Sequence, residues 1–149
     1  MSTILFLDFD GVLHPIVGEP VEGTFCRLPM LEGLLREPAL SHVDIVVSST
    51  WREVYPLPEL RRHFSADMRP RVRDVTPSVD DYDGPHRRWQ EIRAWLAMHP
   101  HVERHVTLDD QRGWFPASWG QHAVFTDPAT GLTHDDLAQL RQLLARPQE

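Results

Sequence analysis

The sequence contains no lysine and only one cysteine, Cys26. A single cysteine can form neither a disulfide within the chain nor a cysteine-rich metal site, which fits a reducing compartment. No apolar run reaches the roughly 20 residues of a membrane-spanning helix. The apolar first residues carry two aspartates and no basic segment, so they predict a buried strand and not a signal peptide. We therefore expect a cytoplasmic protein with no membrane partner.

Length and composition predict one globular domain spanning residues 1–149. The 149 residues are 41% hydrophobic and 25% charged, which is sufficient for one core. The net charge of −7 argues against bulk non-specific binding of nucleic acid. All 15 basic residues are arginine, and nine of them share residues 51–100 with eight acidic residues. This stretch is interpreted either as solvated helix faces or as a rim facing phosphate groups, whose oxygens match the guanidinium fork.

Strand and helix signals alternate along the chain. Apolar or β-branched runs predict strands, three- and four-residue spacing of apolar side chains predicts helices, and residues 11–29 read as irregular or hairpin-like. The last helix opens at Thr133, where Asp136 completes an acidic variant of a capping box. Strands are expected over 3–7, 44–48, 71–75, 105–108 and 123–125, and helices over 30–40, 57–64, 89–97 and from 133. This order predicts an α/β, three-layer, Rossmann-like fold with a mostly parallel sheet of about five strands.

Two carboxylates follow the first predicted strand. Asp8 and Asp10 are separated by one residue, so their side chains point to the same side of the chain. Two like charges at that distance are costly unless a cation neutralises them, and a hard divalent ion is the usual partner. Gly11 then allows a sharp turn away from the strand. The alternative interpretation is an Asp-Gly turn without chemistry.

The ends of the second and fourth strands also carry polar residues. Ser48 and Ser49 would suit phosphate oxygens, although they are equally explained as caps of the following turn. Asp109 and Asp110 are paired carboxylates at a strand end, which favours a bound metal. Ligands of parallel α/β sheets bind beyond the carboxyl ends of the strands. These residues are therefore candidates for one shared site.

A pair of arginines, Arg87 and Arg88, opens the helix that carries Ile92. A cation at the amino-terminal end of a helix opposes the helix macrodipole, which suggests that the cation holds an anion. By this argument alone the two arginines are equal candidates.

Together these residues resemble the four motifs of the haloacid dehalogenase-like (HAD) superfamily, over nearly the whole chain. The most specific segment is LDFDGVLH, and the other motifs match through their order and spacing. The resemblance implies a HAD-like phosphohydrolase that uses Mg²⁺ and an aspartyl-phosphate intermediate to hydrolyse phosphomonoesters. It implies that Asp8 is the nucleophile and that Asp10 is the general acid/base. It also implies that the Ser48 hydroxyl binds the phosphoryl group and that Arg88 stabilises it. Asp109 with Asp110 would form the metal site. The metal would also contact Asp8 and the main-chain carbonyl of Asp10.

The chain departs from the family pattern at the third motif, which is usually lysine. Arginine must serve here, and the match of Arg88-x-x-x-Ile92 to the family's helix pattern favours Arg88 over Arg87. Ser48 and Ser49 remain alternatives for the residue that binds the phosphoryl group. Asp109 and Asp110 remain alternatives for the main metal ligand.

Several other functional classes fit less well. A phospho-acceptor signalling domain needs its acceptor aspartate on a middle strand and a late lysine, and this chain has neither. A Walker-type nucleotide loop is absent. His99, His101 and His105 lack the spacing of a helical zinc-binding pair. The remaining alternative is a catalytically silent HAD-like domain that binds phosphorylated ends or nucleic acid.

Substrate size is the last expectation. In the resembled family a cap domain inserted after the first or third strand usually selects the substrate. The segments 10–44 and 88–109 leave no space for one. An uncapped site is open to solvent, so a large phosphorylated partner or a second copy of the chain must exclude water. Among small and macromolecular phosphorylated substrates, the arginine-rich stretch favours a nucleic-acid end.

Overall fold

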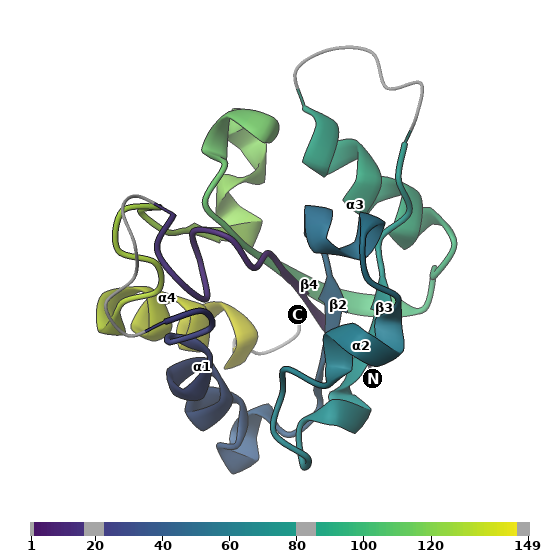
Figure 1. The fold of residues 1–149 in the computed structure, drawn as a ribbon. Coiled ribbons are helices and arrows are strands. Elements are labelled where there is room, and N and C mark those ends of the chain that lie inside the picture. Colours follow the sequence, from purple (N-terminus) through teal and green to yellow (C-terminus); the bar gives the residue numbers. More distant parts are fainter. Residues whose placement is uncertain (1, 17–22, 80–85, 146–149) are drawn as a thin grey trace.

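Five strands form one parallel sheet in the computed structural model, which describes residues 2–16, 23–79 and 86–145. The strand order is β3-β2-β1-β4-β5, so β1 lies in the middle of the sheet (Figure 1). The strands are β1 (Ser2–Leu7), β2 (Val43–Val47), β3 (Val72–Val75), β4 (Val102–Asp109) and β5 (Ala123–Phe125). The prediction of an α/β fold with a parallel sheet of about five strands is confirmed.

The connections between the strands are helical. The α-helices are α1 (Leu28–Leu35), α2 (Leu57–Arg61), α3 (Arg87–Ala97) and α4 (His134–Ala145). Short 3₁₀ helices are η1 (Pro38–Leu40), η2 (Thr50–Glu53), η3 (Arg69–Arg71), η4 (Arg112–Trp114) and η5 (Ala117–His122). The predicted helix over 30–40 begins earlier and ends at Leu35. Pro38 explains its end, because a proline disfavours the helical conformation of the preceding residue, and Glu37 is extended with ψ of 135°.

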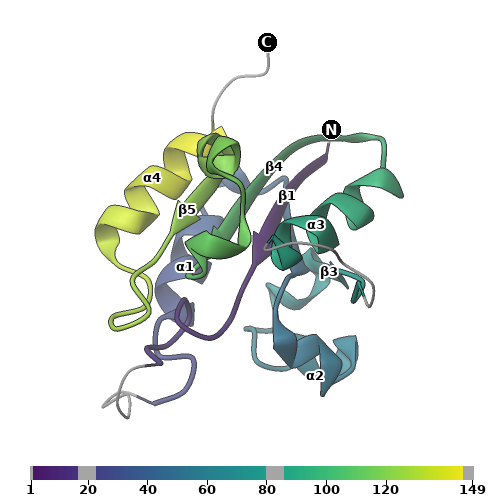
Figure 2. The same cartoon turned by 90° about the horizontal axis from the view of Figure 1, so that it is seen from above.

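Alternate side chains of the central strands enter two different cores. Leu5 and Leu7 of β1 pack in the larger core with α1 and α4, whereas Ile4 and Phe6 pack in the smaller core with α3. Figure 2 shows α1 and α4 on one side of the sheet and α3 on the other. Burial on both faces explains why β1 is a continuous apolar run. The result is the expected three-layer arrangement.

The described connections contain no separate cap unit. Between β1 and β2 the described residues form turns, α1 and η1, and only residues 98–101 separate α3 from β4. Part of the segment predicted to be irregular, residues 17–22, lies outside the described residues. In the described part of the chain, no helix combines the length and the hydrophobicity of a membrane span.

Candidate active site

The main chain just beyond the strands continues the hydrogen bonding of the sheet. The amide of Asp8 donates to the carbonyl of Leu108 at 3.0 Å, and the amide of Ser48 donates to that of Leu7 at 2.8 Å. The amide of Thr126, which follows β5, likewise donates to the carbonyl of Asp109 in β4 at 2.9 Å. This bonding extends the order of the sheet by one residue. The polar residues that follow the strands are therefore held on rigid backbone, at one edge of the sheet.

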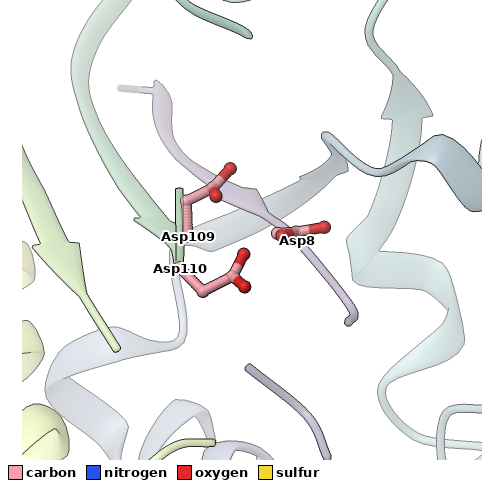
Figure 3. A group of neighbouring side chains, drawn as sticks. All are labelled: Asp8, Asp109 and Asp110. Atoms are coloured by element: carbon pink, nitrogen blue, oxygen red, sulfur yellow. The ribbon is translucent and has the colours of Figure 1, made fainter. Parts of the chain in front are cut away.

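Asp8, Asp109 and Asp110 form an acid cluster at this edge, between the ends of β1 and β4 (Figure 3). One carboxylate oxygen from each lies within 4.8 Å of the others. Asp8 and Asp109 are buried, with exposed fractions of 5% and 0%, and Asp110 is partly buried. Oxygen ligands at this spacing suit a hard divalent cation such as Mg²⁺.

Burial strongly affects the ionisation of the two inner carboxyl groups. Removal from water raises the pKa of Asp8 well above its usual value, and the carboxylate of Asp109 raises it further, while Arg88 lowers it. Burial also raises the pKa of Asp109 to about 7, against an opposing effect of Arg88. Like charges in a low-dielectric site favour protonated forms, and a divalent cation reverses that preference. The protein therefore needs positive charge here if both groups are to be ionised.

Arg88 lies beside this cluster, whereas Arg87 does not. Nε of Arg88 lies 3.7 Å from Oδ2 of Asp109, and the guanidinium stacks over the Trp114 ring at 5.2 Å. The Arg88 side chain is 4% exposed and lines a pocket together with Asp8 and Asp10. Arg87 is 35% exposed, and it pairs with Glu53 at 3.2 Å. Of the two candidate arginines, the structure brings Arg88 to the acid cluster.

A buried ion-pair network fixes the position of α3 behind Arg88. Glu91, one turn after Arg88, accepts a hydrogen bond from Arg52 at 2.5 Å, and its other oxygen lies 3.5 Å from Arg88. Arg52 also donates to the carbonyls of Ser49 and Thr76, at the ends of β2 and β3. Arg52 thus joins α3 to the strand ends, although the sequence suggested only surface or phosphate-facing arginines in this stretch.

The two candidate serines have different surroundings. Oγ of Ser49 accepts a hydrogen bond from the Trp51 amide at 3.3 Å and caps η2. Oγ of Ser48 is buried and has no hydrogen-bond partner among the described residues. Ser49 therefore has the capping role that the sequence offered as an alternative, and Ser48 keeps an available hydroxyl.

The carboxylate of Asp10 is not part of the acid cluster. Its Oδ1 accepts a hydrogen bond from the Trp51 indole at 3.0 Å and lies 2.8 Å from Nε2 of His14. The Asp10 side chain is 45% exposed and lines the same pocket as Asp8. Of the four predicted metal-binding aspartates, the structure gathers the carboxylates of three. The predicted part of Asp10 in metal binding was its main-chain carbonyl, and that remains a proposal.

Four buried polar atoms at this site lack hydrogen-bond partners among the described residues: Ser48 Oγ, Arg88 Nε, Asp109 Oδ2 and Asp110 Oδ2. A buried polar atom without a partner is costly, about 1–3 kcal/mol for a neutral group and more for a charged one. The hydroxyl and the guanidinium N–H can donate to an anion, and the carboxylate oxygens can bind a cation. The residues present therefore fit a phosphate group together with Mg²⁺.

Sequence reasoning missed several residues of the site. His14 stands within the LDFDGVLH segment, and Trp51 follows Ser49 by two residues, but the sequence assigned a role to neither. Thr126, whose hydroxyl donates to the Gly11 carbonyl at 2.7 Å, gave no signal either. Glu91 could have been suspected, because a charged residue one turn after Arg88 lies on the same side of a helix.

The comparisons with known proteins identify one family. Residues 4–137 match the family described as "HAD domain in Swiss Army Knife RNA repair proteins". Nothing among curated proteins or among solved structures matches the chain.

Proposed function

Since the chain belongs to the family of HAD domains in Swiss Army Knife RNA repair proteins, we propose that it is a magnesium-dependent phosphatase that removes phosphate from RNA ends. The observation that carries this proposal is the set of partnerless donors and acceptors around the acid cluster. The donors suit the negative charge of a phosphomonoester, and the acceptors suit the positive charge of a divalent cation. Phosphohydrolase chemistry also agrees with the HAD family itself.

Asp8 is the proposed nucleophile. Its carboxylate attacks phosphorus, the bond from phosphorus to the leaving oxygen breaks, and the proton of Asp10 goes to that oxygen. Water then attacks the aspartyl phosphate while Asp10 accepts a proton from it, and the bond to Asp8 breaks to release phosphate. Ser48 and Arg88 donate to the phosphoryl oxygens throughout. The carboxylate of Asp8 regains its starting state after each turnover.

The proposed metal ligands are Asp8, Asp109 and Asp110, with the main-chain carbonyl of Asp10. Bound Mg²⁺ would neutralise charge on the phosphoryl oxygens and keep the buried carboxyl groups ionised. Arg88 adds a permanent positive charge that does not depend on pH. It takes the place that lysine usually has in the HAD superfamily.

The size and position of the pocket favour a large substrate. The pocket that contains Asp8, Asp10 and Arg88 has a volume of about 240 Å³, below the roughly 300–1,000 Å³ typical of small-molecule sites. Ile16, at its rim, is 47% exposed. A terminal phosphate can enter while the rest of a polymer lies outside. Because this family is named for RNA repair proteins, an RNA end is the substrate that we propose.

A substrate panel tests this proposal. Catalytic efficiency would be measured for RNA oligonucleotides phosphorylated at the 3′ or the 5′ end, matching DNA, phosphopeptides and sugar phosphates. We expect RNA ends to be preferred, activity to vanish in chelator, and Asp8→Asn to be folded but inactive. Asp135→Asn, at an exposed position of α4, is the matched control and should retain activity.

Three results would contradict the proposal. One is full activity in chelator, and another is a clear preference for a small metabolite by a monomeric enzyme. The third is tight binding of phosphorylated RNA without any release of phosphate, which would instead support the catalytically silent binding domain.

A further inference from the structure

Two side chains contact the same carboxylate oxygen of Asp10. The Trp51 indole nitrogen, which can only donate, lies 3.0 Å from Oδ1. His14 Nε2 lies 2.8 Å from that oxygen. These residues come from different elements, since Trp51 belongs to η2 after β2 and His14 follows the turn after β1. Two segments of the chain thus contact the same oxygen of Asp10.

A backbone contact determines where His14 carries its hydrogen. The Phe25 amide donates to Nδ1 of His14 at 3.2 Å, so Nδ1 must present a lone pair. The hydrogen of the imidazole ring is then on Nε2, and Nε2 donates to Asp10. A doubly protonated ring would set an N–H against the Phe25 N–H. The geometry therefore requires the Nε2–H tautomer.

The backbone at Phe25 is held in an unfavourable conformation to make this contact. Phe25 has φ of +62°, and it is the one non-glycine residue with positive φ in the described parts of the chain. Such a conformation is uncommon for a bulky side chain and is unfavourable for the backbone. Its ring packs edge-on against Phe9 and His14 and at a tilt against Trp51, with centroid distances of 5.1–5.4 Å. This packing compensates for the strain and fixes the amide against His14.

The two donors dictate which oxygen of Asp10 can carry a proton. A hydroxyl on Oδ1 would face both N–H groups, whereas Oδ2 has no such donor among the described residues. We propose that His14 and Trp51 are positioning residues, which hold Asp10 through Oδ1 so that Oδ2 is the oxygen that transfers the proton. The inference rests on the proposed function, in which Asp10 protonates the leaving oxygen and later accepts a proton from water.

Substrates with different leaving groups separate this role from a merely structural one. An alkyl phosphate leaves as a poor alkoxide and needs a proton, whereas p-nitrophenyl phosphate leaves with little assistance. Trp51→Phe and His14→Phe keep an aromatic ring but lose the N–H. We expect kcat/KM to fall about 10- to 100-fold with the alkyl phosphate and less than about threefold with the aryl phosphate. The reason is that these variants would lose part of a general-acid effect, which only the alkyl phosphate needs.

Two control variants sharpen the test. His14→Gln places an amide N–H near the former Nε2 and should restore most of the activity toward the alkyl phosphate. Trp119→Phe loses an indole hydrogen bond of similar length, 3.1 Å to Thr107, outside the site. It should change neither substrate's kcat/KM. Equal losses on both substrates, or no loss on either, in Trp51→Phe and His14→Phe would overturn the inference.

A spectroscopic measurement checks the contact without activity. In protein with ¹⁵N-labelled histidine, His14 should appear as the Nε2–H tautomer at neutral pH, and the Nε2 proton signal should shift in Asp10→Ala. A ring protonated on Nδ1 would overturn the inference even in an active enzyme. Failure of the proposed function looks different, because a wild-type protein that releases phosphate neither from RNA ends nor from the two small phosphates would overturn the function and this role together.

Discussion

Two residues of the acid cluster are unfavourable for the folded chain in the absence of a cation. Asp8 and Asp109 are buried, and each has a raised pKa because burial opposes its charge. Arg88 offsets part of this effect from 3.7 Å away. Perturbed carboxyl groups of this kind concentrate at functional sites. The cost to stability therefore supports a role in binding or catalysis rather than in folding.

Gly11 permits the approach of Asp110 to the other carboxylates. Its φ is +75°, and a Cβ atom at this position would overlap the Asp110 side chain. We predict that Gly11→Ala lowers the affinity for Mg²⁺ at least about tenfold and also destabilises the fold by about 1–2 kcal/mol through the left-handed conformation. Isothermal titration with Mg²⁺ and chemical denaturation would measure the two effects.

Gly23→Ala is the matched control for that prediction. Gly23 also has a positive φ, +90°, but among the described residues, its chain neighbours aside, no atom lies within 4 Å of the position where a Cβ would lie. It should therefore show the loss of stability alone. If both variants bound Mg²⁺ like the wild type, the contact between Gly11 and Asp110 would have no part in metal binding.

At the scale of elements, the strand ends determine where the acidic groups meet. Asp109 ends β4 and lies beside β1, whose next residue is Asp8. The metal-free folded protein binds a proton at Asp109 with a pKa of about 7, above its ordinary value of 3.8. This group therefore favours the folded state most at low pH. Its contribution is lost as the pH rises from about 3.8 to about 7, because the unfolded chain ionises this group in that range while the folded protein keeps it protonated.

Mg²⁺ should consequently stabilise the protein more at pH 8 than at pH 5.5, where it must displace a proton. We predict a larger Mg²⁺-induced rise in melting temperature at pH 8, measured by calorimetry at constant ionic strength. Asp109→Asn should remove most of the rise at both pH values. Asp135→Asn should behave like the wild type. A rise independent of pH, or larger at pH 5.5, would contradict the raised pKa of Asp109.

Most elements could be predicted from the sequence because local patterns specify them. The apolar run of β1 predicted a doubly buried strand, and the capping box of α4 is present, with Thr133 and Asp136 exchanging hydrogen bonds at 3.0 and 3.2 Å. Helix lengths were predicted less well. The predicted helix over 57–64 ends at Arg61, where the chain turns so that Ser65 can bind the buried Glu32. Such a contact between distant residues has no local pattern.

The order of the site residues along the sequence could be predicted, but the contacts that support them could not. Asp8 and Ser48 follow strands and Asp109 ends one, and a parallel sheet brings strand ends together whatever the intervening sequence. The tautomer of His14, by contrast, depends on the Phe25 amide, and the position of Arg88 depends on the pair of Arg52 and Glu91. These contacts join segments whose relation appears only after folding.

At the scale of the whole molecule, three layers position a small site at the open edge of the sheet. The two cores fix the strands from both sides, and no described segment forms a cap over the acid cluster. Many arginines of the middle stretch brace the fold, since Arg61 and Arg71 donate to main-chain carbonyls. Among the described residues, the pocket lined by Asp8, Asp10 and Arg88 therefore has no separate unit covering it.

The central claim is that Asp8 forms a covalent bond to phosphorus. The most direct measurement is rapid acid quenching of the protein during turnover of a 5′- or 3′-phosphorylated RNA oligonucleotide with Mg²⁺, followed by peptide mass spectrometry. We predict a mass gain of one phosphoryl group on Asp8, absent in chelator and in Asp8→Asn. Phosphate release without any phosphorylated aspartate, or phosphorylation at another residue, would contradict the account.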